Sequence, residues 1–362
     1  LGRFTVPTSQ LQQGWMNTSA FSVIDVDKQE FLGAIVVDEP ERGAAGIWSI
    51  ACNDESVFIS HSGTHEVSVI DHKAMLEKFL NYPNKAVLDY DLTFLYGLRE
   101  RIPLEGNGPR NMILNGDKLI IPTYFADILN IMDINTNEVT SVELNPGREE
   151  TAENKGERYF NDASHCFQNW QSCNGCHPGD ARKDGMNWDL MNDGVGNSKN
   201  CKSMLFSHMT PPNMISGIRE HAERAVRAGF NFIQFFEVSE EDAACVDAYL
   251  KSLRPVPSPY LVNGELSDLA KEGQKVFEKL KCGECHSGVY YTDMKYHRIG
   301  EDIEFEKGWD TPTLREVWRT APYLFDGRAA TMKEVFSVHK HGIEKKVSEK
   351  DIEALTEYVN SL

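Results

Sequence analysis

The sequence contains no apolar run long enough to cross a membrane, and it is short of positive charge. No stretch approaches the roughly eighteen apolar residues that a spanning helix needs. The 37 Lys and Arg residues are outnumbered by 55 Asp and Glu residues, which gives a net charge of −18. Nucleic-acid binding requires a basic face, so this charge excludes it. The chain begins at Leu1 without an apolar leader, and we expect any export signal to have been removed.

The composition is that of a folded globular chain. Apolar residues make up 41% and charged residues 25% of the sequence, both ordinary fractions. A length of 362 residues exceeds one ordinary core and predicts two or three domains. Four of the eight cysteines stand outside any motif, at Cys52, Cys166, Cys201 and Cys245. They are either disulfide-bonded or buried free thiols, and their spacing does not decide between these alternatives.

Two Cys-x-x-Cys-His motifs carry the clearest chemistry in the sequence. They are Cys173/Cys176/His177 and Cys282/Cys285/His286. Two thiols at this spacing bind haem through thioether bonds, and the adjacent His ligates the iron. A zinc ribbon needs Cys pairs about 15–20 residues apart, whereas these motifs are 109 residues apart. The sequence therefore predicts two covalently bound haem c groups in an extracytoplasmic protein, either periplasmic or at the cell surface.

The first 150 residues contain repeated β-strand patterns. Three segments alternate apolar and polar residues and end in Asp, at 22–25, 68–71 and 130–133. The Asp positions are 46 and 62 residues apart, close to one four-stranded propeller blade with an insertion in the second interval. Asn115-Gly116-Asp117 supplies a hairpin turn. The stretch resembles YVTN-type β-propeller blades and predicts a partial propeller of about three blades over residues 1–150. An ordinary β-sandwich is the alternative.

Residues 151–362 contain an internal repeat. The second motif follows the first by 109 residues, and Ser348 follows Ser239 by the same offset. Each of these serines opens an amphipathic segment with a helix-capping pattern. A proline-rich linker at 255–259 separates the copies. We therefore predict a multidomain chain, in which the all-β segment precedes two mainly α-helical cytochrome c-type haem domains at 151–258 and 259–362.

The repeat resembles the bacterial di-haem cytochrome c peroxidase and MauG superfamily. The resemblance rests on TPTLR at 311–315, TAPYLFDGR at 320–328 and YHRIG at 296–300. It implies a peroxidase-like oxidoreductase in which the N-terminal haem reduces hydrogen peroxide. The C-terminal haem relays electrons from a redox donor protein or a small electron carrier. The alternatives are an electron-transfer cytochrome without peroxidase activity, and a MauG-like enzyme that modifies a partner protein.

The resemblance also implies axial ligands for the two irons. His177 and His286 are the proximal ligands. In the family, the distal ligand of the C-terminal haem follows the position of Phe325 by about fourteen residues, which reaches His339 here. His341 is the near alternative and Met332 a third candidate. Imidazole in place of a thioether lowers the reduction potential.

The sequence departs from the family around the N-terminal haem. No His stands near Asn192, where the family has its distal His, and 215–219 replaces a Trp-Asp-Gly-Arg stretch. The family's distal Gln and Glu have no clear counterpart. A peroxidase needs a distal base to move a proton between the peroxide oxygens. The candidates by position are Glu223, Gln234 and His208, followed by Glu220 and His221.

The family further places a calcium ion between its haem domains. It is held by an Asn side chain and two backbone carbonyls, which correspond to Asn200, Thr320 and Pro322 here. Oxygen ligands of this kind suit calcium. The resemblance therefore implies a calcium site at these three residues.

Overall fold

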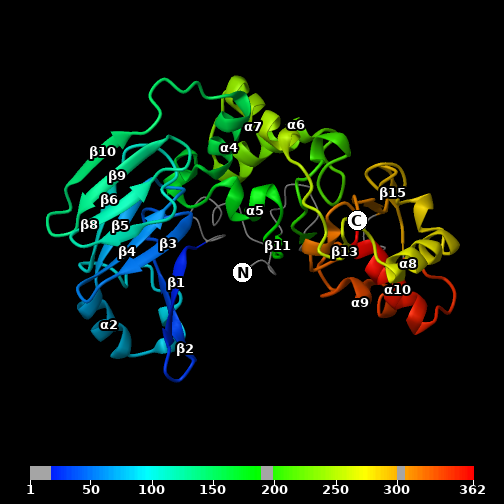
Figure 1. The fold of residues 1–362 in the computed structure, drawn as a ribbon, viewed down its shortest axis with the longest axis horizontal. Coiled ribbons are helices and arrows are strands. Elements are labelled where there is room, and N and C mark those ends of the chain that lie inside the picture. Colours follow the sequence, from blue (N-terminus) through cyan, green and yellow to red (C-terminus); the bar gives the residue numbers. More distant parts are fainter. Residues whose placement is uncertain (1–17, 189–198, 300–305) are drawn as a thin grey trace. The chain divides into compact units, whose positions relative to one another are not determined.

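The computed structural model describes residues 18–188, 199–299 and 306–362 (Figure 1). These residues form two compact units. One, termed the β-rich unit, holds residues 18–175 and 230–246. The other, termed the helical unit, holds residues 176–188, 199–229, 247–299 and 306–362. The stretch predicted as the first haem domain, 151–258, is therefore divided between the two units.

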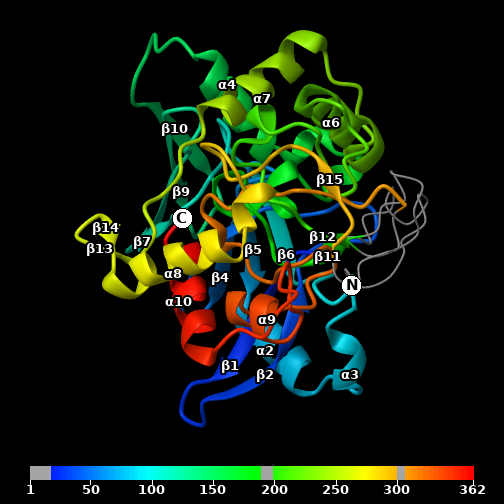
Figure 2. The ribbon, with the colours of Figure 1, turned by 90° about the vertical axis from the view of Figure 1, so that its right-hand side faces the viewer.

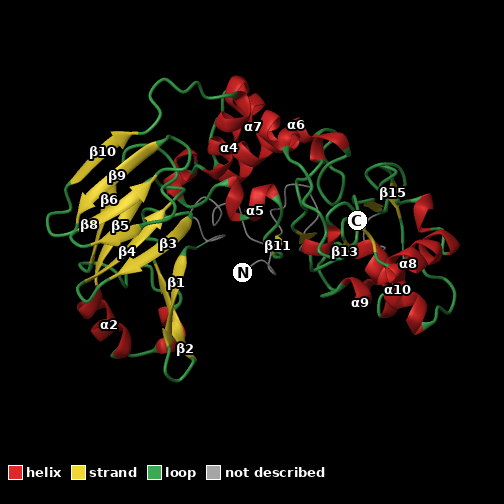
Figure 3. Cartoon of the chain, viewed as in Figure 1, coloured by secondary structure: helices red, strands yellow, loops and turns green. Residues whose placement is uncertain are grey.

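Antiparallel sheets make up most of the β-rich unit and are drawn in yellow in Figure 3. One four-stranded sheet has the order β3-β4-β5-β6 and a second has the order β10-β9-β8-β7, while β1 and β2 form a separate hairpin. The strands are β1 (Ala20–Asp25), β2 (Glu30–Val36), β3 (Ile47–Cys52), β4 (Ser56–His61), β5 (Glu66–Asp71), β6 (Arg99–Pro103), β7 (Ile113–Asn115), β8 (Lys118–Pro122), β9 (Ile128–Asp133) and β10 (Val139–Glu143). The three predicted strands that end in Asp are confirmed as β1, β5 and β9. Of the roughly three blades expected, two are four-stranded meanders typical of a propeller, and the third stretch is a two-stranded hairpin.

Local sequence explains how these sheets turn and pack. β7 and β8 are joined by the predicted turn, where Gly116 has a φ of +57°, a left-handed conformation that glycine adopts without strain. The predicted insertion is helix α2 (His72–Leu80), which α3 (Lys85–Leu88) follows. Apolar residues of both four-stranded sheets meet in one buried cluster that includes Phe58 of β4 and Met132 of β9. Each such side chain contributes about 1.5–3 kcal/mol when fully buried, and this burial holds the two sheets together.

Helices dominate the remainder of the chain. They are α4 (Ala152–Asn161), α5 (Pro178–Ala181), α6 (Ala222–Gly229), α7 (Glu240–Ser252), α8 (Asp268–Lys279), α9 (Met332–Ser337) and α10 (Glu349–Asn360). Short hairpins pair β11 (Asn187–Trp188) with β12 (Lys199–Asn200), β13 (Leu261–Val262) with β14 (Glu265–Leu266), and β15 (Tyr296–His297) with β16 (Trp309–Asp310). The predicted serine caps are confirmed, because Ser239 and Ser348 each accept a backbone N–H three residues later at 3.1 Å. Among the described residues, no helix has the length and apolar character needed to span a bilayer.

The helical unit repeats its own backbone. At an offset of 110 residues, 199–226 and 309–336 run through the same order of strand, 3₁₀ turn, bridge and helix. Left-handed residues recur at this offset, since Phe206 and Glu316 have φ values of 62° and 61°. The strands β11 and β15 keep the offset of 109 residues found for the motifs, so the one-residue difference falls within the hairpin loops. The backbone therefore repeats where the sequence repeats.

Helices α8 and α10 cross in close contact, and Figure 2 shows them side by side. Each buries one apolar face, with Phe277 of α8 and Leu355 of α10 in the same core cluster. Gly273 lies at the crossing, where an added Cβ would overlap the carbonyl group of Ala354. The two helices therefore approach this closely only because residue 273 has no side chain.

We expect Gly273→Ala to lower the free energy of unfolding by about 2–3 kcal/mol or more, because the new methyl group forces α8 and α10 apart. Gly229→Ala in α6 is a matched control, since nothing lies within 4 Å of its Cβ position. This control should be neutral or stabilise by up to about 1 kcal/mol. Urea unfolding followed by tryptophan fluorescence measures both variants. Equal stabilities would contradict the close crossing.

Candidate haem sites

The second Cys-x-x-Cys-His motif forms a 3₁₀ turn at Cys282–Glu284, shortly after α8. Its two cysteines are free and partly buried. His286 is held by a hydrogen bond in which its Nδ1–H donates to the carbonyl oxygen of Tyr291 at 3.1 Å. A carbonyl only accepts, so the ring proton is on Nδ1 and Nε2 presents a lone pair. The motif therefore offers two thiols and one imidazole nitrogen suited to a metal.

The ring of His341 lies near that of His286. The two ring centroids are 6.3 Å apart and the ring planes are tilted by 49°. With metal–imidazole bonds of about 2.0–2.1 Å, and each ring centre about 1.1 Å behind its nitrogen, two axial imidazoles on one metal have centroids about 6.3 Å apart. Burial lowers the pKa of both rings, that of His341 to about 4. Both imidazoles are therefore neutral near pH 7 and able to bind a metal.

The other two candidates for the distal position are placed differently. The backbone N–H of His339 donates to the carbonyl oxygen of Glu334 at 3.0 Å, and its side chain is partly exposed. Met332 is 6% exposed and packs in the apolar core around α9 with Val335. Of the three candidates, His341 is the one with a ring contact to His286 among the described residues.

The first Cys-x-x-Cys-His motif is divided between the units, with Cys173 in the β-rich unit and Cys176 and His177 in the helical unit. Its imidazole repeats the geometry of the second motif. The Nδ1–H of His177 donates to the carbonyl oxygen of Arg182, again five residues later and at 3.1 Å. Burial lowers the pKa of His177 and raises the pKa of the Cys173 thiol to about 12. Both proximal histidines are therefore held as the same neutral tautomer.

A buried ion pair anchors the residue that positions His177. The guanidinium of Arg182 donates to both carboxylate oxygens of Glu316, at 2.5 and 3.1 Å, and the two side chains are 5% and 1% exposed. Glu316 also accepts from Nε of Arg319 at 2.9 Å and from the backbone N–H of Val256. Burial opposes the ionisation of Glu316, but these hydrogen bonds and the charge of Arg182 outweigh it and lower the carboxyl pKa. The pair ties the loop after the first motif to the second copy.

Two of the predicted catalytic residues are engaged in ion pairs. Nε2 of His208 lies 2.9 Å from a carboxylate oxygen of Asp247, and the two side chains are almost fully buried. The carboxylate of Glu223 lies 3.0 Å from Nζ of Lys251 at a partly exposed position. Each side chain is therefore held by a charge of opposite sign, and neither is free to act as a proton-transfer group as it stands.

Gln234 differs from these two residues. It ends the π-helical turn Phe230–Gln234 and is 2% exposed. Neither polar atom of its amide has a hydrogen-bond partner among the residues that the structure describes. Gln171, two residues before Cys173, donates to the carbonyl oxygen of Ile233 at 3.1 Å, which places Gln234 beside the loop of the first motif. An unpaired buried amide is costly and indicates that another group bonds to it here.

Two other expectations lie outside the described residues. They are Asn192, the position of the family's distal His, and Gly300, the last residue of the 296–300 element.

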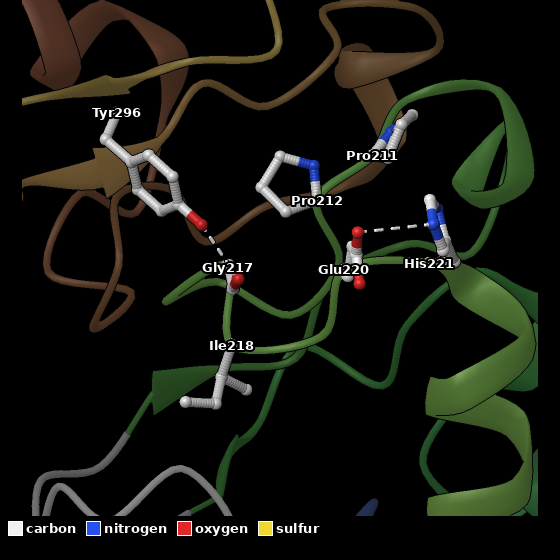
Figure 4. Close-up of a pocket in the computed structure, with 7 residues that line it drawn as sticks. All are labelled: Pro211, Pro212, Gly217, Ile218, Glu220, His221 and Tyr296. Atoms are coloured by element: carbon white, nitrogen blue, oxygen red, sulfur yellow. Dashed lines mark hydrogen bonds and ion pairs between the residues drawn. The ribbon is translucent and has the colours of Figure 1, made fainter.

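An open pocket of about 460 Å³ lies within the helical unit (Figure 4). Its lining consists of Pro211, Pro212, Gly217, Ile218, Glu220, His221 and Tyr296. The Tyr296 hydroxyl donates to the carbonyl oxygen of Gly217 at 2.8 Å, so the pocket contains the turn that replaces the family's Trp-Asp-Gly-Arg stretch. Glu220 and His221 approach to 3.7 Å on its rim, with side chains 73% and 61% exposed. Because water reaches both groups, the pocket does not give them the shielded setting of a distal base.

The four cysteines outside the motifs carry free thiols. All eight cysteines lie in described segments, and none forms a disulfide. Cys166 and Cys245 are buried, while Cys52 is exposed. Sγ of Cys201 donates to the carbonyl oxygen of Cys176 at 3.1 Å and lies 3.6 Å from Nδ1 of His177. These positions fit the free-thiol alternative.

A lysine lies at the expected calcium site. Nζ of Lys183 donates to Oδ1 of Asn200 and, at 2.9 Å, to the carbonyl oxygen of Pro322. Burial lowers the pKa of Lys183 to about 8, which leaves it charged at neutral pH. In the part of the chain that the structure describes, no three His, Cys, Asp or Glu side chains gather into a metal site. Calcium takes about six to eight oxygen ligands, so these residues do not fit it as they stand.

The residues of the second motif do fit a covalent haem, because they combine two free thiols, a proximal imidazole with a free Nε2 and a second imidazole at axial spacing. Sequence reasoning missed Arg182, Lys183 and Glu316, none of which belongs to a motif. Comparison of the two copies offered the available signal, because Tyr291 stands at the position that corresponds to Arg182.

We expect Glu316→Ala to lower the free energy of unfolding by about 3–5 kcal/mol, because it leaves the charge of Arg182 buried without a partner. Lys333→Ala removes exposed ion pairs with Glu349 and Glu353 and should cost about 1 kcal/mol or less. The folded-state pKa of Glu316 is lowered, so its contribution is full above the ordinary value of 4.5 and is lost as the pH falls through the folded value. Urea unfolding across this range measures the effect. Equal losses in the two variants would contradict the buried pair.

Comparison with known proteins gives distant relatives. No protein-family model matches the chain. It is 26% identical over 272 residues to hydrazine synthase subunit gamma of Kuenenia stuttgartiensis, a match that covers 57% of this chain and 76% of that subunit. A solved chain of xenon-pressurised Kuenenia stuttgartiensis hydrazine synthase has a TM-score of 0.53 at 23% identity, covering 60% of this chain and 89% of that one. A MauG-like protein associated with microbial copper homeostasis has a TM-score of 0.47 at 18% identity, covering 61% and 91% of the two chains. The chain is thus a distant homologue of hydrazine synthase subunit gamma and shares the fold of a hydrazine synthase chain.

Proposed function

We propose that this chain is a di-haem c-type redox protein whose C-terminal haem is a six-coordinate electron relay with His286 and His341 as axial ligands. The observation that carries the proposal is the 6.3 Å separation of the two rings. When bound, haem iron supplies one-electron exchange. His286 contributes a fixed tautomer, and His341 contributes a neutral, buried imidazole. The proposal includes an extracytoplasmic location and a redox donor protein or small electron carrier as the partner.

The surroundings of His286 suit an electron relay. Tyr291, whose carbonyl group holds His286, packs edge-on against Phe277 at a centroid distance of 6.4 Å. Its hydroxyl lies 3.3 Å from that of Tyr358, a residue of the buried face of α10. This aromatic cluster fixes the carbonyl and therefore the orientation of the imidazole. Two imidazole ligands lower the reduction potential relative to His and Met ligation.

A pair of histidine variants tests the ligand assignment. His341→Ala should convert the C-terminal haem from low spin to high spin, because one axial bond is lost. His339→Ala, two residues away, is the matched control and should leave the low-spin signal intact. Electron paramagnetic resonance and absorption spectra of the oxidised holoprotein measure the change. The opposite outcome, with only His339→Ala producing high-spin haem, would restore the assignment reached by counting along the sequence.

A second proposed function is reaction of a small molecule at the haem of the first motif, with hydrogen peroxide as the substrate that the sequence resemblance implies. The observation in its favour is the unpaired amide of Gln234 beside the first motif. An amide orients a ligand by hydrogen bonding but does not accept a proton as a base does. With His208 and Glu223 held in ion pairs, electron transfer is better supported than peroxide reduction. The relative's name adds hydrazine as another small molecule to test.

If this haem reacts with small molecules, the oxidised protein should contain a high-spin component that changes when hydrogen peroxide or hydrazine is added. Gln234→Leu should slow that change about 5–10-fold, the effect of one neutral hydrogen bond of about 1 kcal/mol. Gln274→Leu, on the exposed side of α8, is the control and should have no effect. Stopped-flow absorption measures the rates. A wholly low-spin spectrum that neither reagent alters would leave only the electron-transfer function.

A further inference from the structure

The two copies in the helical unit contact each other reciprocally. The hairpin of the first copy meets the turn of the second, where the backbone N–H of Asn200 donates to the carbonyl oxygen of Phe325 at 2.6 Å. The hairpin of the second copy meets the turn of the first, where the hydroxyl of Tyr296 donates to the carbonyl oxygen of Gly217 at 2.8 Å. Asn200 and Asp310 end the equivalent strands β12 and β16, so they occupy corresponding positions in the two copies.

Each of these corresponding positions binds a lysine ammonium group. At the first, Lys183 donates to Oδ1 of Asn200 and to the carbonyl oxygen of Pro322, and so joins one copy to the other. At the second, Lys202 of the first copy lies 2.6 Å from a carboxylate oxygen of Asp310 in the second copy. The two lysines come from different points of the first copy, so the internal repeat did not produce the second contact from the first. Both positions are occupied by a cation that the chain itself supplies.

We propose that the ammonium group of Lys183 takes the place of a bridging metal cation, so that this chain joins its two haem-domain copies without calcium. The acceptors are already in use, because Asn200 accepts from Lys183 through Oδ1 and donates to Asn187 through Nδ2 at 2.9 Å. The packing leaves little spare room, since a Cβ added to Gly327 would lie 2.8 Å from Nδ2 of Asn200.

Charge and coordination number support the same conclusion. One ammonium group has three donors and is well served by two or three neutral oxygen acceptors. Calcium carries twice the charge and takes about six to eight oxygens, usually including carboxylates. Here the acceptors are one amide oxygen and one backbone carbonyl oxygen, while the hydroxyl of Thr320 donates to the carbonyl oxygen of Val317 at 3.0 Å. An ammonium group within the chain also cannot be removed by a chelator.

The calcium content and thermal stability of the holoprotein test this proposal. Wild-type protein that has been treated with EGTA, exposed to calcium chloride and desalted should contain no calcium by mass spectrometry. Its thermal midpoint should be the same in EGTA and in calcium chloride. Retention of one calcium ion per chain, lost in Asn200→Ala, would overturn the proposal. This measurement needs no variant of Lys183, so it stands even if such a variant fails to fold.

Variants of Lys183 give a second, independent test. Lys183→Met should lower the thermal midpoint in EGTA by about 4–8 °C, because it leaves two buried acceptors without a donor. Lys345→Met, at an exposed position of the same unit, is the control and should not shift it. A Lys183→Met midpoint equal to that of the wild type in EGTA would show that the ammonium group does not bridge the copies. The spin states of the haems do not enter this test, so its failure is distinguishable from failure of the proposed function.

Discussion

An imidazole binds a metal only through a nitrogen without a proton, so the bond made by its other nitrogen decides whether it serves as a ligand. In both motifs that bond is made to the main chain. Nδ1–H of His177 donates to the carbonyl oxygen of Arg182, and Nδ1–H of His286 donates to that of Tyr291. A carbonyl group cannot donate in return, so each ring is held as one tautomer with Nε2 available. The loop after each motif must therefore be held rigidly, and much of the helical unit serves this purpose.

The two copies hold those loops by different physical means. In the second copy, Tyr291 is fixed by aromatic packing with Phe277 and by the approach of its hydroxyl to that of Tyr358. In the first copy, Arg182 is fixed by a buried ion pair with Glu316, a residue of the other copy. The first arrangement is insensitive to charge, whereas the second depends on an ionised carboxylate. One duplicated backbone thus supports two unequal sites, as expected of a protein whose two haems have different tasks.

The β-rich unit contributes to the candidate chemistry as well as to the scaffold. It contains Cys173 of the first motif and the π-helical turn that ends at Gln234. The hydrogen bond from Gln171 to the carbonyl oxygen of Ile233 holds that turn beside the motif. A buried amide without a partner is a cost that a folded chain does not ordinarily keep. Its presence here, rather than in the sheets, places the unexplained polarity next to the haem attachment loop.

The sequence by itself determined the elements whose signal is local. The two motifs, the capping serines Ser239 and Ser348, the strands that end in Asp and the internal repeat follow from spacing and residue type over short distances. Only the tertiary structure decided which distant side chains meet. Counting along the chain reached His339, but α9 and the turn after it bring the ring of His341 to His286. Asn200 and Pro322 matched a calcium site by position, yet Lys183 reaches both of them. Contacts of this kind depend on how a chain turns after a helix and on the reach of a long side chain, and neither leaves a periodic pattern in the sequence.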